Sequence, residues 1–170
     1  MSEIYLDHAA GTQLLPEVQE LLKNYQHHGN PSSPHSKGRD SRAEIDRVRI
    51  LCRDIFECGL DEVLFTSGAT ESMNMAILGS FLGSIKDQEI KSLRAKKILV
   101  SPLVHSCVWN SIGFLEKYFG VEYEMLPTDG VGRINVESID ETLLENACMV
   151  ICEHGSSEFG HLQPVAQIGK

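Results

Sequence analysis

The sequence predicts an α/β fold in which a mostly parallel sheet is covered by helices on both faces. Short apolar runs typical of strands alternate along the 170 residues with longer stretches whose apolar residues recur at helical spacing. Parallel strands need crossover connections of this kind, and such crossovers place helices on the two faces of a sheet. No internal repeat or linker-like stretch interrupts the pattern, so we expect residues 1–170 to form a single domain.

Five stretches have the periodicity of helices. The first carries Pro16 in its opening turn, where a proline is tolerated because that N–H has no partner inside the helix. The second is strongly charged and is followed by Gly59, a candidate for the left-handed residue that ends a helix, and Gly120 closes the fourth in the same way. The expected helices cover residues 14–27, 38–56, 69–81, 106–119 and 138–144.

Four apolar runs are predicted to be strands, because each is too short for a helix and is bounded by polar or turn-forming residues. A turn over residues 128–132 follows the third run, and a further helix is expected to begin after Pro164. The expected strands cover residues 62–65, 97–100, 121–126 and 147–152.

Composition excludes several classes of function. With 15 Lys and Arg against 24 Asp and Glu, the net charge of −9 argues against nucleic acid as a partner, because phosphate binding needs clustered cations. No apolar run approaches the ~20 residues that cross a bilayer, and the N-terminus lacks the features of a signal peptide, so we expect no membrane partner. Five cysteines without a CxxC pair are typical of a reducing compartment, and we expect a cytoplasmic protein.

Small and hydroxyl-bearing residues follow the expected strand 62–65, at the sheet edge where ligands bind in parallel α/β folds. The segment from Thr66 to Ser72 includes Ala69 and Thr70 and leads into a helix, whose first N–H groups and positive dipole end favour an anion such as a phosphate monoester. The alternative is a simple helix cap by Thr66 or Ser67. The residues alone leave both interpretations open.

His105 follows the expected strand 97–100 and is a candidate for stacking on a planar ligand or for proton exchange. The alternative is a histidine that caps the next helix or faces solvent. His154 and His161 follow the last expected strand, but no third ligand lies at a supporting spacing, so we expect no metal site.

Taken in order, five segments resemble one family, the NifS-like cysteine desulfurases and selenocysteine lyases of the class-V, fold-type-I enzymes that use pyridoxal 5′-phosphate (PLP). The matching segments are YLDHAAGT at 5–12, GNPSSPH at 29–35, FTSGATESMN at 65–74, VHS at 104–106 and EHGSSEFG at 153–160. The resemblance implies the large domain of a PLP-dependent transferase, here incomplete, with residues 1–35 packed on an absent small domain or across a dimer.

The resemblance also implies a set of cofactor-binding residues. The main chain of Ala69 and the main chain and hydroxyl of Thr70 would hold the PLP phosphate, and His105 would stack on the pyridine ring and take part in proton transfer. Ser157 stands where the family usually has an asparagine that reaches the ring hydroxyl. Because serine is shorter, we expect that hydrogen bond to be lost or bridged by water.

The implied reaction removes sulfur or selenium from L-cysteine or L-selenocysteine and leaves L-alanine. The family's Schiff-base lysine, its partner for the pyridine nitrogen and its persulfide-forming cysteine match none of the 170 residues, and Lys170 does not stand in the family's Ser-x-His-Lys context. We therefore expect no covalent PLP attachment and no activity from this chain alone, and a second polypeptide with the C-terminal half, or a homo-oligomer, as partner. The alternative is a degenerate, non-enzymatic PLP-fold interaction or regulatory module.

Overall fold

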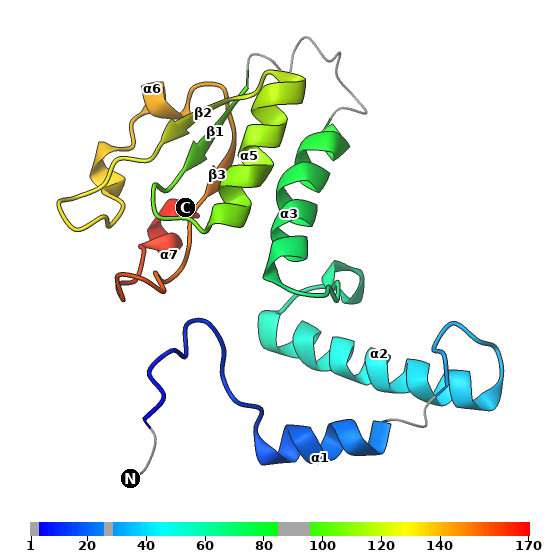
Figure 1. The fold of residues 1–170 in the computed structure, drawn as a ribbon. Helices are drawn as coiled ribbons and strands as arrows, with labels where there is room; N and C mark the ends of the chain where they lie inside the picture. The colour runs from blue at the N-terminus through cyan, green and yellow to red at the C-terminus, as the bar shows by residue number, and fades with distance from the viewer. Residues whose placement is uncertain (1–3, 26–28, 85–95) are drawn as a thin grey trace. The chain divides into compact units, whose positions relative to one another are not determined.

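The computed structural model describes residues 4–25, 29–84 and 96–170 (Figure 1). The chain forms two compact units, Met1–Phe65 and Thr66–Lys170. The first contains helices α1 (Pro16–Asn24) and α2 (Ser36–Phe56), both predicted, although the last residues of the expected helix 14–27 lie outside the described ones. The assignment of one domain to residues 1–170, and the packing of residues 1–35, stay predictions.

Helix α2 begins and ends with local polar contacts. His35 is its N-cap, and the ring Nδ1 accepts a hydrogen bond from the Gly38 N–H at 3.2 Å. At the other end Glu57 adopts the left-handed conformation with φ of 53°, and its N–H bonds to the Arg53 carbonyl. The assignment of this position to Gly59 was therefore wrong by two residues. Gly59 has a φ of −74° and instead precedes a 3-10 helix, Leu60–Glu62.

The expected strand over residues 62–65 is also wrong. Val63 has extended torsion angles, but the segment pairs with no strand in the described part of the chain, and Leu64 is 68% exposed. Arg49 of α2 holds it instead, because Nε donates to the Val63 carbonyl at 3.4 Å and the guanidinium lies 5.3 Å from the Phe65 ring centroid. An apolar run becomes a strand only where another strand satisfies its backbone groups.

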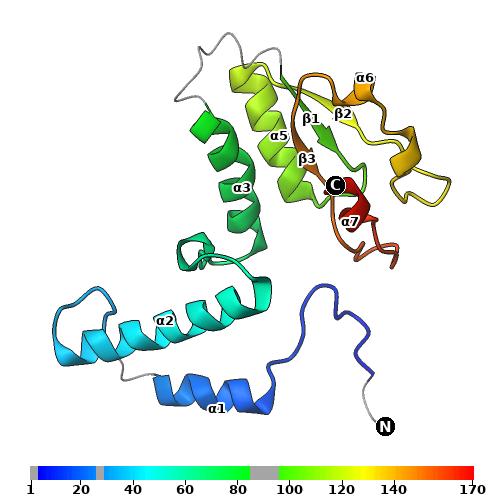
Figure 2. The same cartoon turned by 180° about the vertical axis from the view of Figure 1, so that it is seen from behind.

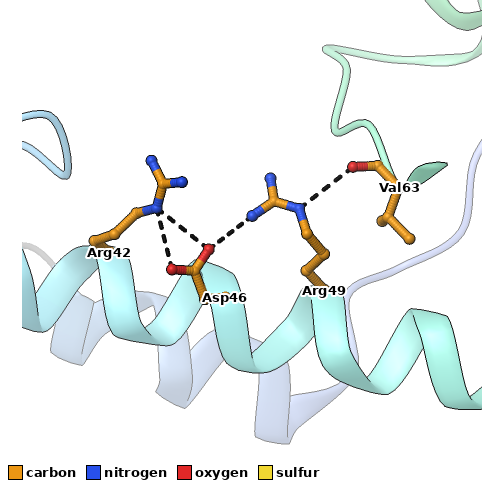
Figure 3. A network of polar contacts seen from close by, with 4 residues as sticks. All are labelled: Arg42, Asp46, Arg49 and Val63. Carbon is orange, nitrogen blue, oxygen red and sulfur yellow. Dashed lines mark hydrogen bonds and ion pairs between the residues drawn. The ribbon is translucent and has the colours of Figure 1, made fainter. Parts of the chain in front are cut away.

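Asp46 fixes the direction of that arginine (Figure 3). Its Oδ1 accepts from Arg49 Nη1 at 2.7 Å, and its carboxylate also pairs with Arg42 Nε at 3.1 Å. All three side chains lie on one side of α2, because Arg42 is four residues before Asp46 and Arg49 is three residues after it, the spacings at which side chains of a helix meet. The network therefore fastens the segment after the 3-10 helix to α2.

Close packing at the start of α2 gives a first testable prediction. A Cβ on Gly38 would lie 2.3 Å from the Ser33 carbonyl oxygen and 2.7 Å from that of Asn30, so the loop must move in Gly38→Ala. Overpacking of this kind costs about 1–3 kcal/mol. Hydrogen exchange should show the first turn of α2 opening at least about fivefold more readily. Gly11→Ala, where a Cβ meets nothing within 4 Å, is the control, and equal protection in the two variants would contradict the clash.

The second unit confirms the α/β fold class. Its sheet has three parallel strands in the order β2-β1-β3, with Val100 of β1 beside Met125 on one side and Ile151 on the other. The strands are β1 (Lys97–Val100), β2 (Glu122–Met125) and β3 (Ala147–Ile151). The helices are α3 (Ala69–Ser84), α5 (Ser106–Phe119), α6 (Glu141–Leu144) and α7 (Val165–Ile168).

Local signals set the boundaries of two helices in this unit, α5 and α6. Helix α5 covers the expected residues and ends at Gly120, whose φ of 68° is the left-handed value predicted for it. The expected helix over residues 138–144 is instead two short pieces, a 3-10 helix over Val136–Ser138 and α6. They are separate because Asp140 takes an extended N-cap conformation and its Oδ1 accepts from the Leu143 N–H at 2.8 Å.

Helices lie on both faces of the sheet, as predicted (Figures 1 and 2). Along β1, Ile98 and Val100 are fully buried in one apolar cluster with residues of α3 and α5. Leu99 points the other way, into a second cluster with Leu126 and Ile134 that residues of α6 and α7 complete. This alternation arises because successive side chains of a strand point to opposite faces. Among the described residues, no helix is long and apolar enough to cross a membrane.

Candidate functional site

The loop before α3 leaves the first N–H groups of that helix unused. Thr66 Oγ donates to the Gly68 carbonyl and lies 2.7 Å from Ser72 Oγ, while the Ser67 N–H and hydroxyl both donate to Glu71 Oε2 at 2.6 Å. The hydroxyls of Thr66 and Ser67 therefore do not accept hydrogen bonds from the N–H groups of the first helical turn in the described part of the chain. Among the residues that the structure describes, none accepts a hydrogen bond from the N–H of Ala69 or Thr70. This arrangement favours the anion-binding interpretation of the loop over the simple cap.

Glu71 is held as a carboxylate by this loop, which gives a prediction for pH dependence. The Ser67 hydroxyl, and then its N–H, hold the pKa of Glu71 below its ordinary value of 4.5. A carboxylate whose pKa folding lowers stabilises the folded state fully above pH 4.5, and this contribution is lost as the pH falls through the folded-state pKa. We therefore expect the unfolding free energies of wild type and Glu71→Gln to differ most above pH 4.5 and to converge below it.

Urea unfolding from neutral pH down to about pH 3 measures this difference. Glutamine keeps an oxygen acceptor for Ser67 and removes only the charge, so the titration of the other carboxylates cancels between the two proteins. A difference that stays constant across this range would show that folding does not lower the pKa of Glu71.

His105 lies between β1 and α5, and both its ring and its main chain are hydrogen-bonded. As N-cap of α5, its ring Nδ1 accepts a hydrogen bond from the Cys107 N–H at 3.2 Å. The main-chain N–H of His105 donates to Glu153 Oε1 at 2.7 Å, and the two residues are 48 positions apart in the sequence. His105 is thus a helix cap, as one interpretation of the sequence had it, and its side chain still lines a cavity.

One cavity of about 220 Å³ brings three of the four predicted site residues together. Ala69 and Thr70 line it from the first turn of α3, and His105 lines it from the start of α5. The rest of the lining is mostly apolar and also includes two thiols and one carboxylate. These further residues are Met73, Val104, Cys107, Val108, Ile151, Cys152 and Glu153.

Ser157 is the fourth predicted site residue, and it is exposed and not among the residues that line this cavity. Its neighbour Ser156 closes a local turn, because Ser156 Oγ accepts from the Phe159 N–H at 3.0 Å. The role of Ser157 in cofactor binding stays a prediction.

Two residues of the cavity, Glu153 and Cys107, were missed by the reasoning from sequence. Glu153 is the second residue after β3, so the rule that ligands bind at strand ends already pointed to its position. Its bond to the His105 N–H depends on how β3 and α5 pack, which no local pattern encodes. Cys107 is buried, and its sulfur contacts the His105 ring.

Comparison with known proteins identifies the family. Residues 4–170 match the family Aminotransferase class-V. The chain belongs to the aminotransferase class-V family. It is 33% identical over 168 residues to "Cysteine desulfurase IscS 1" of Archaeoglobus fulgidus, and 35% identical over 170 residues to "Cysteine desulfurase IscS" of Dictyoglomus turgidum. The matches cover 98% and 99% of this chain but 42% and 41% of those relatives, so the chain spans about two fifths of their length.

Solved structures with the same fold are found among known proteins. "SspA in complex with cysteine" matches 97% of this chain and 46% of that one, with a TM-score of 0.81 and 29% identity. DndA from Streptomyces lividans matches 97% and 45%, with a TM-score of 0.76 and 31% identity. These findings confirm the resemblance to NifS-like cysteine desulfurases and the fold that it implied.

The class-V cysteine desulfurases depend on PLP, and the cavity suits the parts of PLP that these residues would contact. The Ala69 and Thr70 N–H groups, at the positive end of the α3 dipole, fit a phosphate. The apolar walls fit a flat aromatic ring. Among the described residues that line the cavity there is no lysine.

Proposed function

We propose that this chain provides the phosphate cradle and the ring-stacking histidine of a PLP-dependent cysteine desulfurase or selenocysteine lyase site. The observation that carries the proposal is the convergence of Ala69, Thr70 and His105 on one cavity. These residues come from two separate segments of the chain, and the family resemblance implies a cofactor-binding role for each. L-Cysteine or L-selenocysteine is the proposed substrate.

Each residue contributes one physical effect. Ala69 and Thr70 would bind the phosphate through their main-chain N–H groups, and the Thr70 hydroxyl adds a donor. His105 would pack on the ring and hold or move a proton at Nε2, because Nδ1 already accepts the Cys107 N–H. The apolar walls exclude water and strengthen these polar contacts. When bound, PLP supplies a ring that stabilises negative charge developing on the substrate.

The same proposal holds that the 170 residues alone bind PLP without a covalent bond and do not release sulfur from L-cysteine. The absence of lysine from the described residues that line the cavity supports this part. We propose that the lysine and the nucleophilic cysteine come from a second polypeptide that carries the C-terminal half of the site, or that a second copy of the chain completes it. The proposed compartment is the cytoplasm, which the free thiols of Cys52, Cys58, Cys107, Cys148 and Cys152 support.

Exposed apolar side chains favour such a partner. No described residue of the first unit has a buried apolar side chain. Helix α1 exposes Val18, Leu21 and Leu22. In the second unit, β2 and β3 are the edges of the sheet, and all four residues of β2 are exposed. Unpaired strand edges and uncovered apolar faces are the usual places where another chain associates.

PLP titration of the purified chain tests the proposal. We expect saturable quenching of the fluorescence of Trp109, the single tryptophan, and dialysis should then remove the PLP and its visible absorbance from the protein. Borohydride treatment followed by mass spectrometry should leave the lysines unmodified, and L-cysteine should yield no sulfide. Absence of saturable binding would contradict the cofactor assignment, and a modified lysine or released sulfide would contradict the proposed dependence on a partner.

A further inference from the structure

The His105 ring is held from one side by a single residue. Its Nδ1 lies 3.2 Å from the Cys107 main-chain nitrogen and 3.2 Å from Cys107 Sγ. A backbone N–H can only donate, so Nδ1 must be the acceptor in this contact. In a neutral imidazole one nitrogen accepts and the other carries the proton, and the proton of His105 is therefore placed on Nε2.

The Cys107 thiol can support the same tautomer. A protonated thiol is a weak donor, and from 3.2 Å it can share the Nδ1 lone pair with the Cys107 N–H in a three-centre hydrogen bond. The opposite tautomer would set an N–H on Nδ1 against the Cys107 N–H, which removes the cap of α5. Cys107 is only 7% exposed, so water does not easily take the place of its sulfur.

We propose that Cys107 is a positioning residue for His105, whose thiol holds the ring in the Nε2–H tautomer and so fixes which nitrogen meets a ligand in the cavity. The role of this tautomer in cofactor binding rests on the proposed function, which places His105 against the cofactor ring. The tautomer itself is a property of the ligand-free chain.

The main chain of His105 is held independently of Cys107. Glu153 Oε1 accepts the His105 N–H at 2.7 Å, and this contact does not involve the thiol. Removing the sulfur should therefore leave the ring held by the Cys107 main-chain N–H alone, while the backbone of His105 stays in place. The effect on the tautomer can thus be separated from a displacement of the whole segment.

Nitrogen NMR of the full chain labelled with ¹⁵N-histidine tests the proposal, with the His105 signals assigned from their loss in His105→Gln. In wild type we expect the Nε2–H tautomer to predominate in mildly alkaline buffer. In Cys107→Ala the fraction with the proton on Nδ1 should rise at least about threefold, as expected when a weak hydrogen bond is lost. Cys107→Val should behave alike and provides a second apolar variant if alanine leaves the site poorly folded. Cys107→Ser, which restores a donor, should return the fraction to the wild-type value.

Cys152→Ala is the matched control, because Cys152 lines the same cavity and has no recorded contact with the ring in the described part of the chain. It should leave the His105 tautomer unchanged. A predominant Nδ1–H form in wild type, an unchanged fraction in both Cys107→Ala and Cys107→Val, or an equal change in Cys152→Ala would each overturn the proposal.

Adding PLP to the same samples distinguishes this proposal from the proposed function. If PLP leaves the wild-type His105 signals unshifted while the variants change the tautomer as expected, the cofactor assignment fails and the role of Cys107 stands. If PLP shifts the signals but the tautomer does not respond to the thiol, the positioning role fails and the cofactor assignment stands.

Discussion

Ala69→Asp is expected to weaken PLP binding at least about 30-fold and to make α3 slightly more stable. A carboxylate beside the phosphate places like charges together, which costs several kcal/mol, and every 1.4 kcal/mol is tenfold in affinity. The same carboxylate lies in the first turn of α3, where the helix dipole favours a negative charge by about 0.3–1 kcal/mol. The substitution therefore separates ligand binding from stability, because the two effects have opposite signs.

Tryptophan fluorescence during PLP titration and urea unfolding of the same protein measure the two effects. Ala69→Ser is the matched control, since it adds a small neutral side chain at an exposed position and should change PLP affinity by less than about threefold. Equal PLP affinity of Ala69→Asp and wild type would show that the phosphate does not bind at the start of α3.

Leu99→Ala is expected to lower the free energy of unfolding by about 2–5 kcal/mol, the largest loss of stability among the substitutions considered. Leu99 has no exposed surface and lies in β1, the central strand of the sheet. Its side chain packs in the apolar cluster that residues of α6 and α7 complete. Truncation leaves a cavity there, and neighbouring strands on both sides limit how far β1 can relax into it.

Urea unfolding followed by Trp109 fluorescence measures this loss, because Trp109 packs against the cluster on the opposite face of the same strand. Leu144→Ala is the control, since Leu144 is 48% exposed, and its free energy of unfolding should change by no more than about 0.5 kcal/mol. A loss in Leu99→Ala as small as that of the control would mean that the second face contributes little to the stability of the sheet.

The parts of the fold that the sequence predicted are those whose signals are local. Helix α5 was placed correctly because its apolar spacing and the glycine at 120 act within a few residues. Strand β1 was placed correctly because its four residues are apolar or amphipathic, and three of them are fully buried. Residues 62–65 have a similar composition, yet Arg49 binds them and no strand pairs with them in the described part of the chain.

The candidate site divides in the same way. From the sequence by itself came the small and hydroxyl residues at the start of α3, the histidine before α5, and their family resemblance, because these are properties of short segments. Only the tertiary structure decided that Ala69, Thr70 and His105 share one cavity, that Ser157 lies outside its lining, and that Glu153 binds the His105 main chain. The physical reason is that these contacts join residues tens of positions apart, and their geometry is set by how strands and helices pack.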